Sequence, residues 1–145
     1  MKIAIGCDPN AASLMQMIEA LCVETGNEPV LVGKDDPIYA NTAILVGEGV
    51  ASGKYDRGIL VCGTGIGMMI AANKVKGAYA ALLSDIYSAR RAILSNDSNI
   101  ACLGAFTLGE KVIAELLREW LSLQYLPGTP SEKKIARYKA YDQTR

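Results

Sequence analysis

Short apolar runs alternate along the chain with segments in which apolar residues recur every three to four positions. The apolar runs cover residues 2–7, 29–32, 57–62, 78–83 and 100–103. The segments of helical spacing cover residues 11–24, 39–50, 66–75, 85–94 and 109–123. Short apolar runs predict buried strands, and the helical period predicts amphipathic helices. Strands and helices in strict alternation predict an α/β fold with a parallel sheet.

The five strand and helix units predict a Rossmann-like three-layer αβα sandwich with a five-stranded parallel sheet. A chain of 145 residues fits one domain with a continuous core, so residues 1–145 are predicted to form a single domain. Loops at the carboxyl ends of parallel strands meet in one crevice, where we expect the functional site. Residues 126–145 contain proline and glycine followed by a polar helical pattern, and we expect this tail to contact a partner subunit.

Composition and charge narrow the classes of partner. Half of the residues are hydrophobic but only 6% are aromatic, which suits helices packed on a buried sheet. Lys plus Arg and Asp plus Glu number 15 each, and no basic run is interleaved with aromatic residues, so no nucleic-acid partner is expected. No apolar stretch approaches the ~20 residues of a membrane span. We therefore expect a cytoplasmic protein without a membrane partner.

The four cysteines are widely separated and the chain contains no histidine. Cys7, Cys22, Cys62 and Cys102 form no CxxC pair, so neither a zinc site nor a thioredoxin-like motif is predicted, and reduced thiols are expected. The absence of histidine excludes Ser-His-Asp and Cys-His catalytic machinery and removes the commonest metal ligand. We expect no metal site.

A glycine-rich turn follows the third predicted strand and opens the next predicted helix. It reads Cys62-Gly63-Thr64-Gly65-Ile66-Gly67. Backbone N–H groups at such a turn, with a helix dipole behind them, favour an anion. The spacing is not GxGxxG, because Met68 follows Gly67, and the lysine of a nucleotide-binding phosphate loop is absent. Asp85 lies about where a dinucleotide fold places its ribose acid, so a dinucleotide site stays open as an alternative.

Cys62 ends the strand directly before this turn, where a helix N-terminus can lower a thiol pKa and supply a thiolate base. The alternative is a buried, inert cysteine that packs as a small hydrophobe. The reaction suited to the first interpretation is proton abstraction beside a carbonyl, with backbone donors holding the enediolate oxygen. Returning the proton to the neighbouring carbon converts an aldose to a ketose and needs no metal or cofactor.

On these residues the chain resembles the family of ribose-5-phosphate isomerase B and the galactose-6-phosphate isomerase subunits over nearly its whole length. The segments that carry the resemblance are residues 3–8, 56–67, 70–75, 87–89, 96–99 and 103–105. The resemblance implies that Cys62 moves the proton between C1 and C2, that residues 63–67 hold the enediolate and that Asp8 binds substrate hydroxyls. It also implies a homodimer or a tetramer of dimers whose active sites take residues from two subunits.

The candidate site residues divide into a catalytic set and a substrate-binding set. The catalytic set is Cys62, Thr64 and Asp8. The substrate-binding set is Cys7, Tyr39, Gly63, Gly65, Ile66, Gly67, Ser95, Asn96, Asn99, Arg90, Lys133 and Arg137. Among these, Arg90 is a candidate phosphate ligand beside the crevice, and Lys133 and Arg137 are candidates from a neighbouring subunit. Charged residues of this kind are more often a solvated helix face.

The chain departs from the family pattern at several positions. Pro9 replaces the phosphate-site histidine of ribose-5-phosphate isomerase B, Ser95 replaces the ring-opening histidine, and Phe106 replaces an arginine. The Gly-Gly-Arg-His motif of the tail is replaced at residues 128–130. Residues 88–96 look like the tetrulose-phosphate isomerase branch, whereas residues 130–135 look more like the galactose-6-phosphate isomerase B subunit. The substrate therefore stays open at this point.

We predict an aldose-ketose isomerase that acts on a tetrulose phosphate or another small sugar phosphate. A pentose or hexose phosphate is mostly a closed ring that an acid-base group must open, whereas a tetrose phosphate cannot close. The alternatives are a pentose or hexose phosphate isomerase and a non-catalytic sugar-phosphate binding subunit. The missing phosphate-site residues favour the non-catalytic alternative, and the cysteine beside an intact turn argues against it. A hetero-oligomer with a homologous subunit is the alternative to a homo-oligomer.

Overall fold

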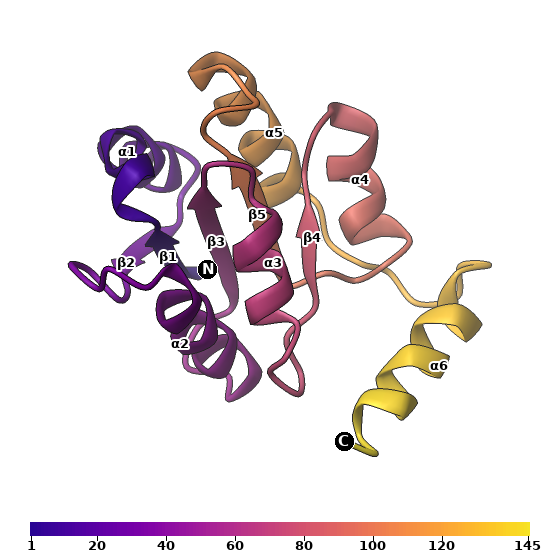
Figure 1. The fold of residues 1–145 in the computed structure, drawn as a ribbon. Coiled ribbons are helices and arrows are strands. Elements are labelled where there is room, and N and C mark those ends of the chain that lie inside the picture. Colours follow the sequence, from indigo (N-terminus) through magenta and orange to yellow (C-terminus); the bar gives the residue numbers. More distant parts are fainter.

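The computed structural model describes residues 1–145 and alternates strands with helices. The strands are β1 (Lys2–Cys7), β2 (Glu28–Leu31), β3 (Arg57–Cys62), β4 (Ala80–Leu82) and β5 (Ile100–Gly104). The helices are η1 (Pro9–Leu14), α1 (Met15–Glu24), α2 (Tyr39–Ala51), α3 (Ile66–Ala72), α4 (Ile86–Leu94), α5 (Glu110–Ser122) and α6 (Glu132–Asp142). The sheet has the order β2-β1-β3-β5-β4 and every neighbouring pair is parallel, so the arrows in Figure 1 point the same way.

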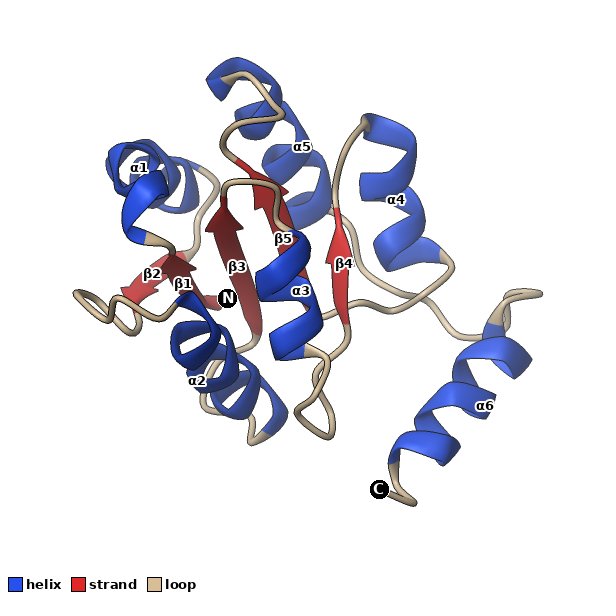
Figure 2. Ribbon diagram, viewed as in Figure 1, coloured by secondary structure: helices blue, strands red, loops and turns tan.

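Helices cover both faces of the sheet and give the molecule three layers (Figure 2). One face packs against α1, α4 and α5 around a core of 19 buried residues, which includes the fully buried Trp120. The other face packs against α2 and α3 around a core of 12 buried residues. The predicted αβα sandwich with a five-stranded parallel sheet is therefore confirmed.

The alternation of side chains along β3 decides which layer each of them faces. Ile59 and Val61 belong to the core under α1 and α5, whereas Leu60 and Cys62 belong to the core under α2 and α3. Successive side chains of a strand point to opposite faces, and both faces are covered, so the whole strand is apolar. Cys62, the last residue of β3, consequently faces the α2–α3 layer.

The first predicted helix, residues 11–24, begins in the structure as a separate 3₁₀-helix. Asp8 caps this helix by accepting a hydrogen bond from the Asn10 backbone N–H at 2.8 Å, and a proline occupies its first turn. The α-helix proper starts only at Met15. The side chain of Asp8 is thus fixed by the turn that follows β1.

The third predicted helix, residues 66–75, ends earlier than its apolar pattern indicates. Helix α3 stops at Ala72, and the next residue, Asn73, pairs with the backbone of Ala80. Its side chain accepts from the Ala80 N–H at 2.8 Å and donates to the Ala80 carbonyl at 3.0 Å. The predicted strand at residues 78–83 is correspondingly shortened to three residues.

Helix α6 stands apart from the sandwich, beside β4 and toward the amino ends of the strands (Figure 1). It buries only Ile135 and Asp142, and no other element packs along its length. The predicted tail of a loop followed by a polar helix is therefore present. None of the helices combines the length and apolar character that crossing a membrane requires.

Candidate active site at the carboxyl edge of the sheet

The carboxyl ends of β1 and β3 bring Asp8 and Cys62 together. The register pairs Cys7 with Val61, and the Asp8 backbone N–H donates to the Val61 carbonyl at 2.8 Å, so Asp8 and Cys62 are neighbours one step further along. The chain winds outward from these two strands in opposite directions, toward β2 on one side and toward β5 and β4 on the other. Open α/β sheets bind ligands at such a switch point.

The Cys62 thiol lies beneath the glycine turn. Its sulfur accepts a hydrogen bond from the Gly65 backbone N–H at 3.1 Å, and the residue is 6% exposed. Gly65 has a φ of 79°, and a Cβ there would lie 2.7 Å from Leu82 Cδ1 and 2.9 Å from the Leu103 carbonyl carbon. Only glycine fits this conformation and this space. The turn is therefore held close against the sulfur.

Several amides of the same turn have no partner within the protein. The backbone N–H groups without a protein acceptor are those of Gly63, Thr64, Gly67 and Met68. The Ile66 N–H makes only a 3.3 Å contact with Thr64 Oγ1. A run of free amides in a turn forms a concave site for an anion. The turn thus combines a sulfur atom with donors that can stabilise negative charge.

Asp8 presents one free carboxylate oxygen beside this turn. Its Oδ1 accepts from the Asn10 N–H at 2.8 Å, whereas Oδ2 accepts from no group in the protein. The residue is buried, and the carboxylate comes from the strand next to the one that carries Cys62. Asp8 therefore has a fixed orientation and one carboxylate oxygen without a partner in the protein.

Aromatic side chains from two other elements border the turn. The hydroxyl end of Tyr39, at the start of α2, lies so close to Gly67 that a Cβ on Gly67 would overlap it. The Phe106 ring lies against Gly63, where a Cβ would be 2.8 Å from Phe106 Cδ2. The structure therefore places Tyr39 at the predicted site and adds Phe106 as an exposed wall.

The loop after β5 clamps the end of β3, which sequence reasoning did not anticipate. The Ala105 N–H donates to the Cys62 carbonyl at 2.8 Å, and the Phe106 N–H donates to the Gly63 carbonyl at 2.9 Å. These bonds exist because β5 is the neighbour of β3 in the sheet. The sequence did not predict these two hydrogen bonds because they depend on β5 lying next to β3, and the sequence does not reveal the strand order.

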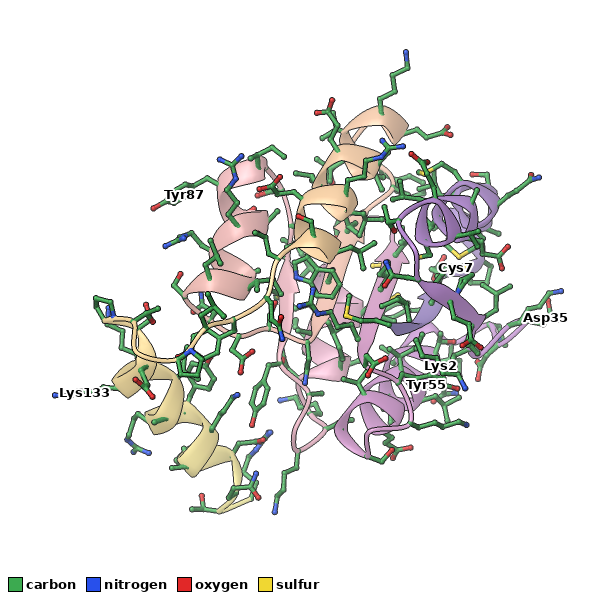
Figure 3. All side chains as sticks on the ribbon, turned by 180° about the vertical axis from the view of Figure 1, so that it is seen from behind. Lys2, Cys7, Asp35, Tyr55, Tyr87 and Lys133 are labelled. Carbon is green, nitrogen blue, oxygen red and sulfur yellow. The ribbon has the colours of Figure 1, made fainter.

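Cys7, a predicted substrate contact, faces away from Cys62. It packs on the core under α1 and lines a cavity of about 260 Å³ between η1, α1 and the loop after β2. Figure 3 shows it beside α1. Burial and the neighbouring Asp8 raise the pKa of the Cys7 thiol. The cavity does not include Cys62, and neither do the two cavities near α6.

Ser95, Asn96 and Asn99 lie at the opposite edge of the sheet from Cys62 within one chain. Helix α4 runs antiparallel to the strands, so its end and the start of β5 lie at the amino edge. The Asn99 side chain accepts from the Tyr79 N–H at 2.7 Å, and Ser95 Oγ and Asn96 Nδ2 both donate to the Arg91 carbonyl. The structure does not bring these three together with Cys62 of the same chain.

The predicted cationic residues also lie away from the glycine turn. Arg90 pairs with Glu119 at 2.7 Å on the outer surface of α4 and α5. Lys133 and Arg137 are exposed on α6, and Figure 3 shows Lys133 pointing away from the body of the molecule. Lys34 is the only basic residue in the loops at the carboxyl edge. One chain therefore offers little positive charge near Cys62.

Asp85, the acid on which the dinucleotide alternative rests, has a structural role at the start of α4. Asp85 caps α4, and its carboxylate accepts from the Ser88 N–H at 2.7 Å and from Ser84 Oγ at 3.1 Å. The hydrogen bond from Ser88 is the main cause that lowers the pKa of Asp85. This carboxylate already has its partners. No group of three or more Cys, Asp or Glu side chains is arranged to hold a metal ion.

Known proteins with similar sequences and structures match almost the entire chain. A family model described as Ribose/Galactose Isomerase matches residues 3–138. The D-erythrulose-4-phosphate isomerase 2 of Mycolicibacterium smegmatis is 40% identical over 98% of this chain and 97% of its own. The Ribose-5-P isomerase B of Listeria innocua is 40% identical over 99% and 98%. The type B ribose 5-phosphate isomerase of Trypanosoma brucei superposes with a TM-score of 0.92 at 39% identity, covering 97% of each chain.

Replacing Gly65 by alanine tests whether the turn must lie against the sulfur. At Gly65, the φ is positive and an added Cβ would lie under 3 Å from Leu82 and Leu103. At Gly53, the φ is 77° and an added Cβ would have no neighbouring heavy atom within 4 Å. We expect Gly53→Ala to lower the free energy of unfolding by about 1–2 kcal/mol, the strain of a left-handed alanine. Gly65→Ala should lower it clearly further in urea unfolding. Equal losses in the two variants would contradict the described packing.

Proposed function

The chain belongs to the ribose/galactose isomerase family of sugar-phosphate isomerases, and from this premise we propose that it interconverts an aldose phosphate and a ketose phosphate with Cys62 as the base. One observation carries the proposal. The Cys62 sulfur accepts the Gly65 amide hydrogen at 3.1 Å and adjoins four amides without a protein acceptor. A base beside donors for a developing oxyanion is what enolisation requires.

The proposed reaction moves one proton between two carbons through an enediolate. The Cys62 thiolate, to which the Gly65 N–H donates, takes the proton from the carbon beside the carbonyl. The electrons of the C–H bond form the C=C bond, and the carbonyl oxygen becomes the anion that the free amides stabilise. The hydroxyl proton on the second carbon then passes to the neighbouring oxyanion, so that the second oxygen becomes the new carbonyl oxygen, and the electrons of the C=C bond take the proton back from the thiol at the former carbonyl carbon. The Oδ2 atom of Asp8, which has no partner in the protein, accepts a hydrogen bond from a substrate hydroxyl and so orients the substrate.

A four-carbon ketose phosphate is the proposed substrate. The chain has no histidine that could open a sugar ring, and a four-carbon chain with its terminal oxygen phosphorylated has no hydroxyl placed to close a five- or six-membered ring. Sequence identity to the relatives does not distinguish a four-carbon from a five-carbon substrate, since an erythrulose-phosphate isomerase and a ribose-phosphate isomerase are each 40% identical to the chain. The proposal of a four-carbon substrate therefore rests on the absence of a histidine that could open a sugar ring. Pentose and hexose phosphates are the alternative substrates.

The proposed enzyme is a homo-oligomer built from dimers with shared active sites. Five candidate residues lie too far from Cys62 of their own chain to share a site with it, and a second copy of the chain would supply them. These residues are Ser95, Asn96, Asn99, Lys133 and Arg137. Exposed apolar side chains of two adjoining helices, next to the turn, suit a subunit interface. These side chains are Ile38 before α2, Leu45 on α2, and Ile66 and Ile70 on α3. A homologous second subunit is the alternative partner.

We also propose that the enzyme works in the cytoplasm without a cofactor. All four cysteines are unpaired, which suits a reducing compartment. The isomerisation leaves the oxidation state of the whole substrate unchanged. The base and the amides therefore supply the chemistry that the reaction needs.

A non-catalytic sugar-phosphate binding subunit is the second candidate. It is favoured by the burial of Cys62, which is 6% exposed and lines none of the three cavities described above. In that case the thiol would be a packed core residue and the amides alone would bind the ligand. Turnover separates the two candidates, because binding without turnover would stabilise the fold and leave the sugar phosphate unchanged.

Replacing Cys62 by alanine tests the proposed base. We expect kcat/KM on a panel of four- to six-carbon sugar phosphates to fall by ~100-fold or more in Cys62→Ala, because a positioned base contributes rate enhancements of that scale. The four-carbon ketose phosphate should be the best substrate of the wild-type protein. Steady-state kinetics with product analysis measures both quantities.

The control for this variant is Cys22→Ala, which removes a buried thiol from α1 on the other face of the sheet. Its activity should stay within a few-fold of wild type once its folding has been verified by circular dichroism. A Cys62→Ala protein with kcat/KM equally close to wild type would refute the proposed base.

Subunit mixing tests the shared active site. We expect Cys62→Ala and the double variant Lys133→Ala/Arg137→Ala each to be impaired alone. A dimer with one copy of each variant has one of its two sites with both functional segments intact, so isolated mixed dimers should show about half of wild-type activity. Differently tagged subunits, refolded together and purified by both tags, isolate the mixed dimers. Activity no higher than the average of the two parents would contradict sharing.

A further inference from the structure

Helix α6 is attached to the rest of the chain by several polar contacts, by the buried Ile135 and by the Tyr138 ring, whose centroid lies 5.7 Å from that of Tyr79. The Tyr138 hydroxyl donates to the Asn96 carbonyl, and Lys139 Nζ lies 2.5 Å from Asp97 Oδ2. Cavities of about 220 and 260 Å³ open between α6 and the β4 edge, so the helix does not pack closely there. Because Ile135 is the only apolar side chain that α6 buries, the position of the helix also depends on these hydrogen bonds.

Asp142 is the centre of this attachment and is 5% exposed. Its Oδ2 accepts from the Gly77 N–H at 2.7 Å and from the Tyr79 hydroxyl at 3.1 Å, both in the segment between α3 and β4. Its Oδ1 accepts from Arg145 Nε at 3.0 Å. Burial opposes ionisation, but these hydrogen bonds outweigh it and hold the pKa of Asp142 below its usual value. The ionised carboxylate therefore joins the end of α6 to the sandwich.

The face of α6 that carries Asp142 is opposite the face that carries two free cations. Residues 135, 138, 139 and 142 follow helical spacing and contact the body of the molecule. At 100° per residue, Lys133 and Arg137 lie on the other side of the helix. Both are exposed and neither belongs to an ion pair. The attachment at Asp142 thus sets the direction in which these cations point.

We propose that Asp142 is a positioning residue that fixes α6 so that Lys133 and Arg137 face the phosphate of a substrate bound in the partner's site. The inference rests on the proposed shared active site. Asp142 touches neither the substrate nor the reacting atoms and acts only through the orientation of α6. Loss of its carboxylate therefore weakens phosphate binding and leaves the proton-transfer step unchanged.

The test compares Asp142→Ala and Tyr79→Phe with the control Glu115→Ala, which removes an exposed carboxylate of α5. In Asp142→Ala we expect amide hydrogen exchange in α6 to accelerate ~10-fold or more, because hydrogen bonds to a buried charge are among the strong ones. KM for the sugar phosphate should rise ~10-fold while kcat stays within about twofold. Tyr79→Phe removes one donor and should give an intermediate effect. Glu115→Ala should change neither quantity.

Each contrary outcome overturns a defined part of the proposal. Unchanged exchange in α6 of Asp142→Ala would show that the carboxylate does not hold the helix. Faster exchange with an unchanged KM would show that the helix position does not matter for phosphate binding. A fall in kcat together with a lower melting temperature would indicate general destabilisation instead of positioning. If the wild-type protein turns over no sugar phosphate, the proposed function fails, and hydrogen exchange alone still decides whether Asp142 holds α6.

Discussion

The hydrogen bond from the Gly65 amide to the Cys62 sulfur holds the glycine turn against the thiol, and the proposed chemistry depends on it. Neighbouring strands make this contact possible. The loop after β5 fixes the carbonyl of Cys62, and the end of β1 sets Asp8 beside the same residue. Gly65 itself must be glycine, because its φ of 79° and the nearby Leu103 backbone exclude a side chain. The thiol environment is thus a product of sheet order and one backbone conformation.

Parallel topology separates the remaining candidate residues from this centre. The turn after β3 lies at the carboxyl edge, whereas Asn96, Asn99 and α6 lie at the amino edge or beside it. Within one chain, the thiol is buried and the exposed cations Lys133 and Arg137 lie away from it, and the proposed shared active site follows from this separation. An assembly that places the amino edge of one copy over the carboxyl edge of another would complete that site.

The periodicity of apolar residues predicted the alternating strands and helices and with them the layers and the parallel sheet, and the glycines between β3 and α3 predicted the turn. Predicting which face of the sheet each side chain points to also requires the register of the strands. Cys7 and Asp8 are adjacent in sequence, yet Cys7 lines a cavity on the α1 side while Asp8 lies beside Cys62. The clamp from Ala105 depends on β5 lying next to β3, and apolar spacing does not encode strand order. Asn96 and Asn99 are substrate-binding candidates, and within one chain they lie at the opposite edge of the sheet from Cys62.

The central claim is that a protein base carries the migrating proton through an enediolate, and isomerisation in heavy water tests it most directly. A thiol proton exchanges with solvent, so the account predicts product with solvent deuterium on the carbon that receives the proton, detected by proton NMR and mass spectrometry. The wild-type protein should give this label with its best sugar phosphate. Full turnover with the original hydrogen carried intact from one carbon to the next would indicate a hydride shift and contradict the account.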